Sequence, residues 1–401
     1  MTSTMRDANL STLLATAEAG LVADGYAVID QALGEHADVI HAALERLRAT
    51  GGLRQHRFGF KADAASAPRV FIKPNIFEAE VQDDAVQHGA RDLTEALRAL
   101  DLPHAAEAAF ESLALRPDGD GADASGVTVK LQCNEGAGGC FPMHFDNAGP
   151  PSKRRLRWAR CAHRSARGEL MWAAPPAPHL RTSTTGLARR SRLLGLVRSG
   201  VSGRMSMAAP PKPPALTSCA RSLVGARSIL CYFNPDWKEG SGGEIELVPW
   251  LRPAVVVPPK HGRLVLFQSD RVLHRVRPSH ARRFCLTVWI DGENTNAAGA
   301  LSVRVPPGAS SDSDLAKVVA ALGPAQRVLS RAVYAEEYEA SLRDCMAGTA
   351  GLDELIRSHD AYCVQSAANA PLARLVRVAR GLKPSAAEAS AAAAAVAEKA
   401  A

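Results

Sequence analysis

Short apolar runs separated by turn-forming residues fill the middle of the chain. From residue 127 onward the runs are four to eight residues long and are bounded by Gly, Pro, Asn and Asp. Runs of this length with turn signals between them are typical of strands in sandwiches and barrels, so the pattern predicts a double-sheet jelly roll or a related barrel. The eight predicted strands are residues 127–132, 140–145, 228–233, 244–248, 254–257, 263–268, 272–276 and 283–290.

Apolar residues at helical spacing flank this region on both sides. Residues 24–33 predict a short strand that leads into the first helix, which Gly51 and Gly52 end. The predicted helices are residues 35–49, about 84–100 and about 104–114 before the strands, and 314–322, 325–346 and 352–367 after them.

The order of these elements predicts an α+β fold with a double-stranded β-helix (jelly-roll) core. Residues 1–120 supply the N-terminal strand and buttressing helices, and residues 121–292 supply the core. Residues 293–401 form a helical C-terminal region that ends in an Ala-rich tail from about residue 385.

The composition is that of a chain with a sizeable core. Of the 401 residues 46% are hydrophobic, and no run of about 18 apolar residues occurs, which excludes a transmembrane helix. The first residues, MTSTMRDANLSTLL, contain no apolar segment behind a basic start, so we expect no secretory signal. Eight cysteines without a CxxC pair argue against a disulfide scaffold or zinc ribbon and favour a reducing compartment, the cytoplasm or nucleus.

One segment accounts for the basic balance of the chain. Residues 151–225 hold 15 Lys and Arg but a single acid, Glu169, whereas the other residues carry 33 basic and 40 acidic side chains. Because the segment is rich in Arg, Ser, Pro, Gly and Ala without lasting periodicity, we interpret about 156–225 as a disordered insert in the core. Either it is a cationic arm for nucleic acid or another polyanion, or it is sequence without function, such as translated intron. The second is favoured because aromatic and Gly-rich recognition patterns are absent.

A histidine and an aspartate two residues apart end one predicted strand. Because residues two apart on a strand point to the same side, His144 and Asp146 can face one cavity. The same spacing in His36-Ala37-Asp38 falls on a predicted helix, where such residues do not share a face, so we interpret it as solvated surface. An imidazole and a carboxylate are two ligands of a facial set that leaves positions open on Fe(II), as an oxygenase requires.

A distant histidine would complete this ligand set. His274 lies in a later predicted strand and is the best candidate, although a buried, hydrogen-bonded core histidine is the commoner meaning of such a residue. His280 falls in the following turn, and His261 precedes a strand after two prolines, so both are poorer candidates.

Residues 283–290 alternate between a face with polar groups and a fully apolar one. The apolar face suits packing against helices, and the other suits a lined pocket. An Arg at the closed end of such a pocket forms a bidentate pair with a ligand carboxylate, whereas the apolar neighbours disfavour an exposed surface Arg. The pocket face holds Arg283, Cys285, Thr287 and Trp289, and the apolar face holds Phe284, Leu286, Val288 and Ile290.

Several motifs in combination resemble the Fe(II)- and 2-oxoglutarate-dependent dioxygenases of the prolyl 4-hydroxylase family. The resemblance covers roughly residues 20–150 and 226–292 and is greatest to the intracellular, oxygen-sensing prolyl hydroxylase branch. Its motifs are DGYAVID near the N-terminus, MHFDN (143–147), CYFNPDW (231–237), SGGEIEL (241–247), LVLFQSDRVLHRV (264–276) and RFCLTVW (283–289).

The resemblance implies a ligand set and a cosubstrate anchor. His144, Asp146 and His274 match the iron ligands, and Arg283, nine residues after the last ligand, matches the residue that binds the 2-oxoglutarate carboxylate. Collagen-type relatives usually have Lys as this anchor, so the Arg favours the intracellular branch.

Further residues match the family's cosubstrate pocket. Tyr232 matches a tyrosine that hydrogen-bonds the same carboxylate, and Thr287 and Trp289 fall at pocket-lining positions. Two departures stand out: Asn134 lies where the family often has a tyrosine, and the segment at about 156–225 has no counterpart.

The resemblance implies that the protein is a peptidyl-proline 4-dioxygenase-like enzyme. Its cofactors would be Fe(II), 2-oxoglutarate and O₂, with ascorbate as an optional reductant, and the cosubstrate would be converted to succinate and CO₂. A protein or peptide partner is expected, and no membrane. Two alternatives stay open: the same chemistry on another peptide residue or a small molecule, or a silent jelly-roll module that binds polyanions, including nucleic acid, through residues 151–225.

Overall fold

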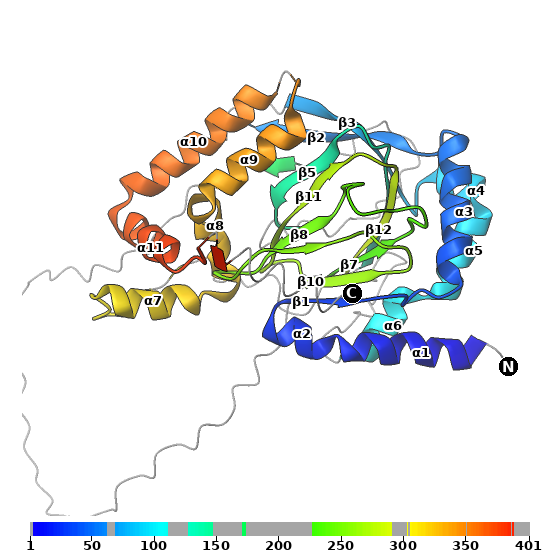
Figure 1. The fold of residues 1–401 in the computed structure, drawn as a ribbon, viewed down its shortest axis with the longest axis horizontal. Helices are drawn as coiled ribbons and strands as arrows, with labels where there is room; N and C mark the ends of the chain where they lie inside the picture. Colours follow the sequence, from blue (N-terminus) through cyan, green and yellow to red (C-terminus); the bar gives the residue numbers. More distant parts are fainter. Residues whose placement is uncertain are drawn as a thin grey trace, which may run out of the picture.

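Two sheets packed face to face form the centre of the molecule, with helices on both outer sides (Figure 1). The computed structural model describes residues 3–61, 69–110, 127–146, 171–173, 227–290, 303, 305–349, 351–385 and 387–388. Apolar side chains from both sheets meet in the space between them, among them Tyr232 and Phe267 from the larger sheet and Ile245 and Leu247 from the smaller one. This confirms the prediction that the protein combines helices with antiparallel sheets.

The larger sheet has eight strands and the smaller one four. Neighbouring strands are antiparallel, except that β6 runs parallel to β2 at one edge of the larger sheet. In spatial order the larger sheet contains β1 (Tyr26–Ile29), β10 (Leu264–Gln268), β7 (Arg227–Tyr232), β12 (Arg283–Ile290), β4 (Val127–Asn134), β3 (Arg69–Glu80), β2 (Arg54–Lys61) and β6 (Met171–Ala173). The smaller sheet contains β5 (Gly139–His144), β11 (Leu273–Ser279), β8 (Ile245–Val248) and β9 (Val255–Val257).

N-terminal helices cover the outer face of the larger sheet (Figure 1). The apolar face of β12, including Phe284 and Leu286, is buried together with Ile40, Leu44 and Leu93 of the helices. This confirms the predicted packing of that face against helices. The helices are α1 (Ser3–Thr16), α2 (Glu18–Ala23), α3 (His36–Ala49), α4 (Asp84–Gly89), α5 (Arg91–Leu100) and α6 (Leu102–Ala109).

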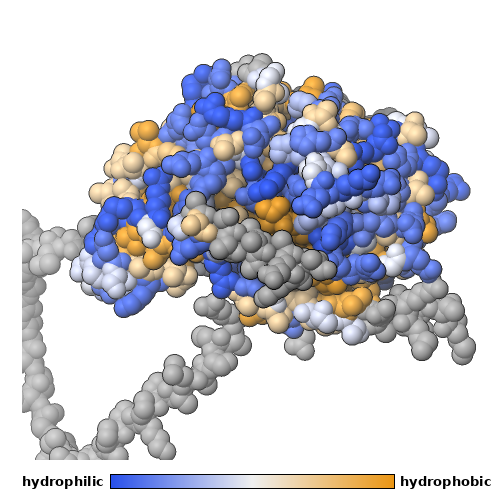
Figure 2. Space-filling view, in the orientation of Figure 1, coloured by the Kyte–Doolittle hydropathy of each residue, from blue (hydrophilic) through white to orange (hydrophobic). Residues whose placement is uncertain are grey.

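C-terminal helices pack on the opposite side, against the smaller sheet. Met143, Val248 and Leu273 of that sheet are buried in one cluster with the helices. On the face shown in Figure 2 hydrophilic residues predominate, and apolar ones gather over α10 and α11. The elements are α7 (Asp312–Ala320), the 3₁₀ turn η1 (Gly323–Gln326), α8 (Arg327–Val333), α9 (Ala335–Met346), α10 (Leu352–Ala368) and α11 (Ala370–Gly381).

Helix α9 covers the free edge of β5. The hydroxyl oxygen of Ser341 accepts a hydrogen bond of 3.0 Å from the Met143 backbone N–H, which would otherwise be a buried edge donor. A disulfide joins Cys140 on β5 to Cys345 on α9. The sequence analysis did not foresee this pair. The expected cytoplasmic or nuclear location stays a prediction.

The sequence places the strands of the core well and the helix boundaries less well. The helix predicted at about 84–100 is two helices, because the backbone dihedral angles of Ala90 are not helical. The helix predicted at 325–346 is likewise divided, at Tyr334. The long hairpin of β2 and β3 was not predicted at all, because basic residues interrupt its alternation.

Two other expectations concern residues that are largely outside the described ranges. The basic insert at about 156–225 is described only at β6, and the Ala-rich tail only at residues 385, 387 and 388. Among the helices that are described, none has the length and apolar character that a membrane crossing needs.

We expect the disulfide to contribute measurably to stability. Changing Cys345→Ser should lower the free energy of unfolding by about 2–4 kcal/mol, because the cross-link restricts the unfolded chain. Denaturant titration without reductant measures the change. Cys363→Ser, which removes a half-buried free thiol of α10, is the matched control. Equal stability of both variants and the parent chain would contradict a stabilising disulfide.

Candidate metal centre

Three side chains from the smaller sheet and the residues after it converge on one point. β5 pairs with β11 so that His144 lies directly opposite His274, and Asp146 follows two residues after His144. The Nε2 atoms of both histidines lie 3.5 Å from Oδ1 of Asp146. One candidate ligand atom from each residue falls within 4.8 Å of the others, which is the spacing of ligands around a single ion.

Hydrogen bonds to the protein fix the direction of each candidate ligand. Nδ1 of His144 lies 2.8 Å from the Pro142 carbonyl oxygen, and Nδ1 of His274 lies 3.1 Å from that of Val272. Both Nδ1 atoms therefore donate to the backbone, and Nε2 is the nitrogen turned toward the metal position. This outer hydrogen bond is the usual arrangement of a metal-ligating histidine.

Two serines hold the carboxylate. The Ser228 hydroxyl of β7 donates to Oδ2 of Asp146, and Ser269 lies 2.8 Å from Ser228. Oδ1 of Asp146 is then the oxygen that faces the two imidazoles. The sequence analysis did not identify Ser228 or Ser269, because the contacts of Ser228 with Asp146 and with Ser269 join distant segments of the chain.

Burial and mutual contacts favour the protonation states that a metal requires. Burial, followed by the nearby His274, lowers the pKa of His144 to about 4, so its imidazole is neutral at pH 7. Burial alone would raise the pKa of Asp146, but His274 and His144 outweigh it and hold the carboxyl well below its usual pKa. Two imidazoles and one carboxylate form the set that suits Fe(II) with open positions.

The alternative histidines lie elsewhere. His261 pairs with Asp38 of α3 at 3.0 Å, and His280 is exposed in the turn after β11. Among the described residues, the group His144, Asp146 and His274 is the one whose ligand atoms are close enough for a shared ion.

A buried guanidinium lies between the sheets near the start of β12. The Arg283 side chain is 2% exposed, and its Nε and Nη2 atoms have no hydrogen-bond partner among the described residues. The Tyr232 hydroxyl is unpartnered in the same sense, and the Arg283 guanidinium carbon lies 4.9 Å from the Tyr232 ring centroid. Such donors are costly to bury alone, so they indicate a bound anion.

The metal ligands and this anion position share strand β7. Ser228 and Tyr232 are four residues apart and therefore face the same side, roughly 13 Å apart along the strand. Ser228 holds the metal-facing Asp146, and Tyr232 adjoins Arg283. The same face of β7 thus adjoins the metal ligands at one end and the unpartnered donors at the other.

Comparisons with known proteins agree with this chemistry. Residues 223–291 match the family model described as the 2OG-Fe(II) oxygenase superfamily. This part of the chain, about a sixth of its length, is similar to that superfamily. The match includes β7, β11 and β12, and thus Tyr232, His274 and Arg283.

Two curated proteins are similar to part of the chain. It is 34% identical to human Egl nine homolog 1 over 99 residues, which are 22% of this chain and 23% of the relative. It is 38% identical to Egl nine homolog 1 of Rattus norvegicus over 68 residues, 16% of this chain and 20% of the relative. The matched segments thus span less than a quarter of these curated relatives.

A solved structure covers far more of the chain. The chain is similar to a crystal structure of prolyl 4-hydroxylases from Phytophthora capsici. The two sequences are 27% identical, the alignment covers 94% of each chain, and the TM-score is 0.62. The superfamily implies Fe(II), 2-oxoglutarate and O₂. The His–Asp–His set fits the metal, and the unpartnered Arg283 and Tyr232 donors fit the far carboxylate of 2-oxoglutarate.

Other predicted pocket residues of the oxygenase lie on the same interior face. Thr287 is buried next to this pocket, and Trp289 pairs with Ser228 across β12 and β7. Asn134 has a structural role. Its side-chain amide donates a hydrogen bond of 2.6 Å to the Gly139 carbonyl oxygen, and its Oδ1 atom accepts one from the Gly136 N–H. It therefore fixes the turn before β5 and does not replace the tyrosine of the family.

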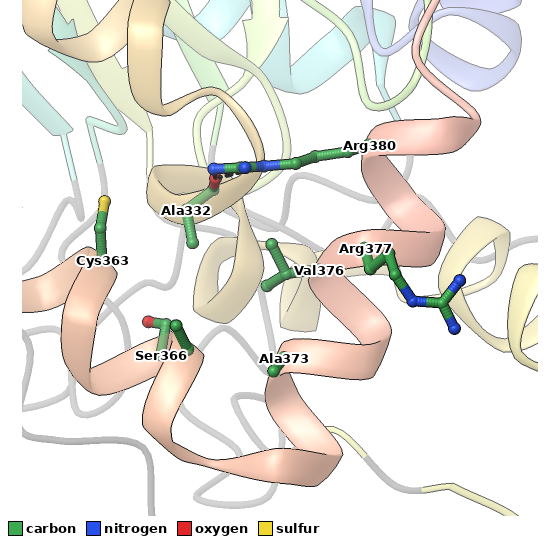
Figure 3. A pocket seen from close by; sticks show the side chains of 8 residues that line it. Ala332, Cys363, Ser366, Ala373, Val376, Arg377 and Arg380 are labelled. Carbon is green, nitrogen blue, oxygen red and sulfur yellow. Dashed lines mark hydrogen bonds between the residues drawn. The ribbon is translucent and has the colours of Figure 1, made fainter.

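A cavity of about 240 Å³ in the C-terminal helices is separate from this centre (Figure 3). It lies among α8, α10 and α11 and is lined by Cys363, Val376 and Arg380 among others. Arg380 donates to the Ala332 carbonyl oxygen at 2.7 Å and is thus already paired. None of the predicted site residues lines this cavity.

Metal binding should depend on the convergent ligands. We expect His274→Ala to abolish high-affinity binding of Fe(II) or Mn(II), and Ser228→Ala to weaken it by about 10–100-fold, because the outer hydrogen bond positions Asp146. Calorimetric titration of the metal-free protein measures both. Exposed His280→Ala is the control, and an equal loss in that variant would contradict the assignment.

Proposed function

We propose that the protein is an Fe(II)- and 2-oxoglutarate-dependent dioxygenase that hydroxylates a peptidyl proline. The observation that carries this proposal is the presence of two complementary features on one interior face. A three-residue ligand set leaves metal positions open, and a buried guanidinium lies without an anion farther along the same strands. Similarity to prolyl 4-hydroxylases supports proline as the target residue.

The metal ligands divide the coordination sphere. His144, Asp146 and His274 would hold the metal from one side, and the other positions would face the space between the sheets. When bound, Fe(II) with 2-oxoglutarate supplies oxidative decarboxylation to succinate and CO₂ together with insertion of oxygen into a C–H bond. Because a carboxylate occupies the third protein position, no vacancy is left for a halide ligand, which favours hydroxylation.

Arg283 and Tyr232 would orient the cosubstrate. The planar guanidinium can bind a carboxylate bidentately, and burial raises the pKa of the Tyr232 phenol, so its hydroxyl remains a donor. Cys285 and Phe267 belong to the buried apolar cluster around this position and exclude water. The Phe267 ring also packs on His274, with centroids 4.6 Å apart, and limits rotation of that ligand.

The proposal extends to the architecture of the chain. We propose that the two facing sheets form the jelly-roll core within residues 121–292 and that residues 1–120 buttress it. Residues 293–401 would form an extension whose helices secure the smaller sheet through Ser341 and Cys345. Nothing in the described residues supports a nucleic-acid partner.

Turnover of a proline peptide tests the activity. With Fe(II), 2-oxoglutarate and O₂, we expect one succinate for each peptide that gains one oxygen atom on proline, measured by mass spectrometry. The same peptide with Pro→Ala and the Asp146→Ala enzyme are the controls. Oxygen found on another residue, or succinate formed without any modified peptide, would contradict a peptidyl-proline hydroxylase.

The anchor can be tested separately from the metal. Arg283→Ala should weaken 2-oxoglutarate binding by about 2–5 kcal/mol, the usual cost of removing one partner from a buried charge pair, while metal affinity stays unchanged. The neighbouring Arg282→Ala is the matched control, since Arg282 is partly exposed and pairs with Glu45 and Glu135. Similar binding constants for the two variants would exclude Arg283 as the anchor.

A further inference from the structure

A second buried cation lies close to the metal centre. The Lys73 side chain of β3 is 4% exposed, and its ammonium nitrogen lies 3.6 Å from the ring centroid of Phe141 and 5.7 Å from that of Phe58. Among the described residues it has no hydrogen-bond or carboxylate partner. Two aromatic faces contribute about 2 kcal/mol or somewhat more each when desolvated, which is less than the several kcal/mol needed to bury an ammonium.

The charges around Lys73 do not balance. Glu78 is the carboxylate nearby, and its Oε2 atom accepts from both His56 and Lys130, the latter at 2.5 Å. Burial opposes ionisation of Glu78, but the hydrogen bond from His56 and the charge of Lys130 lower its pKa to about 2. Burial lowers the pKa of His56 to about 4, so His56 is neutral at pH 7. One carboxylate thus lies beside two lysine side chains, and the ion pair is made by Lys130.

This cluster lies on the same interior face as the candidate centre. Lys130 pairs with Thr287 across β4 and β12, and alternation places both side chains on the interior face that also carries Arg283. The Phe141 ring connects the cluster to the metal, because its centroid is 6.4 Å from that of His144 and 5.5 Å from that of His56. Lys73 is therefore separated from a metal ligand by a single ring.

We propose that Lys73, together with Lys130, forms a subsite that binds an acidic side chain of the substrate next to the target proline. A Glu or Asp of the peptide would supply the counter-charge that the described residues lack. This inference rests on the proposed function and makes it more specific, since it selects acidic proline-containing segments among all possible peptides.

The competing interpretation is a purely structural ion cluster. Lys130, Glu78 and His56 do join β4 to the hairpin of β2 and β3, so these three have a structural role without any ligand. Lys73 differs, because it contributes no ion pair to that network. Burial disfavours its charged form and lowers its pKa, so a carboxylate brought by the substrate would be the partner that keeps its amine protonated. Substituting Lys73 therefore separates the two interpretations, whereas substituting Lys130 leaves Glu78 unpaired.

The experiment compares peptide pairs that differ by one charge. Each pair contains the same proline with Glu or Gln at one position, scanned over three residues on either side. Binding is measured by calorimetry with Mn(II) in place of Fe(II) and with 2-oxoglutarate present, so that no turnover is needed. We expect at least one Glu peptide to bind about tenfold more tightly than its Gln partner.

Substitutions then assign the preference to Lys73. Lys73→Met places an apolar side chain between the two rings. It should reduce the ratio of Glu-peptide to Gln-peptide affinity to about one, while the affinities for the Gln peptide and for the metal stay unchanged. Lys73→Arg should restore the preference, and Lys317→Met, on the exposed surface of α7, should retain it. Thermal unfolding checks that each variant is folded.

The possible results decide between the interpretations. The subsite is supported if the preference for the Glu peptide disappears in Lys73→Met and returns in Lys73→Arg. Absence of any Glu preference in the parent enzyme, or a preference that survives in Lys73→Met, overturns it. If Lys73→Met does not fold, Lys73→Gln takes its place in the same comparison: loss of the Glu preference supports the subsite, and a preference that survives overturns it. Hydroxylation of the Gln peptides tests the proposed function independently.

Discussion

The pairing of β5 with β11 is the constraint on which the candidate centre depends. It places His144 opposite His274, and a shift of one residue would turn one of these side chains to the other face of the sheet. β5 is an edge strand, so half of its backbone groups need a partner outside the sheet. Helix α9 provides it through Ser341 and the disulfide at Cys345, which gives the C-terminal helices a direct part in holding the metal strand.

Much of the centre was predictable because the side-chain period of a strand is two. That rule alone put His144 and Asp146 on one side and assigned Arg283 and Thr287 to a pocket face, where the structure places them. Features that depend on contacts between distant segments were not predictable. The serine support of Asp146 needs β7 beside the end of β5, and the Cys140–Cys345 pair spans 205 residues, so no local pattern indicates either.

The hairpin of β2 and β3 shows why a tertiary context can override a local pattern. Its sequence alternates poorly, since Lys73 and Glu78 stand where apolar residues are expected on an inward face. They are accommodated because Lys130 of β4 pairs with Glu78 and the Phe141 ring of β5 packs against Lys73. The residues that make the hairpin hard to predict are the same ones that give the interior its charge.

Stability and chemistry are thus divided between different layers of the molecule. The larger apolar layers lie outside the sheets, where the N-terminal helices cover β12 and the C-terminal helices cover β5 and β11, and a smaller apolar cluster lies between the sheets. Hydrophobic burial in those layers stabilises the fold whether or not a ligand is bound. The space between the sheets is then free to hold groups that would destabilise an ordinary core. Arg283 and Lys73 are such groups, and their cost is offset only when an anion arrives.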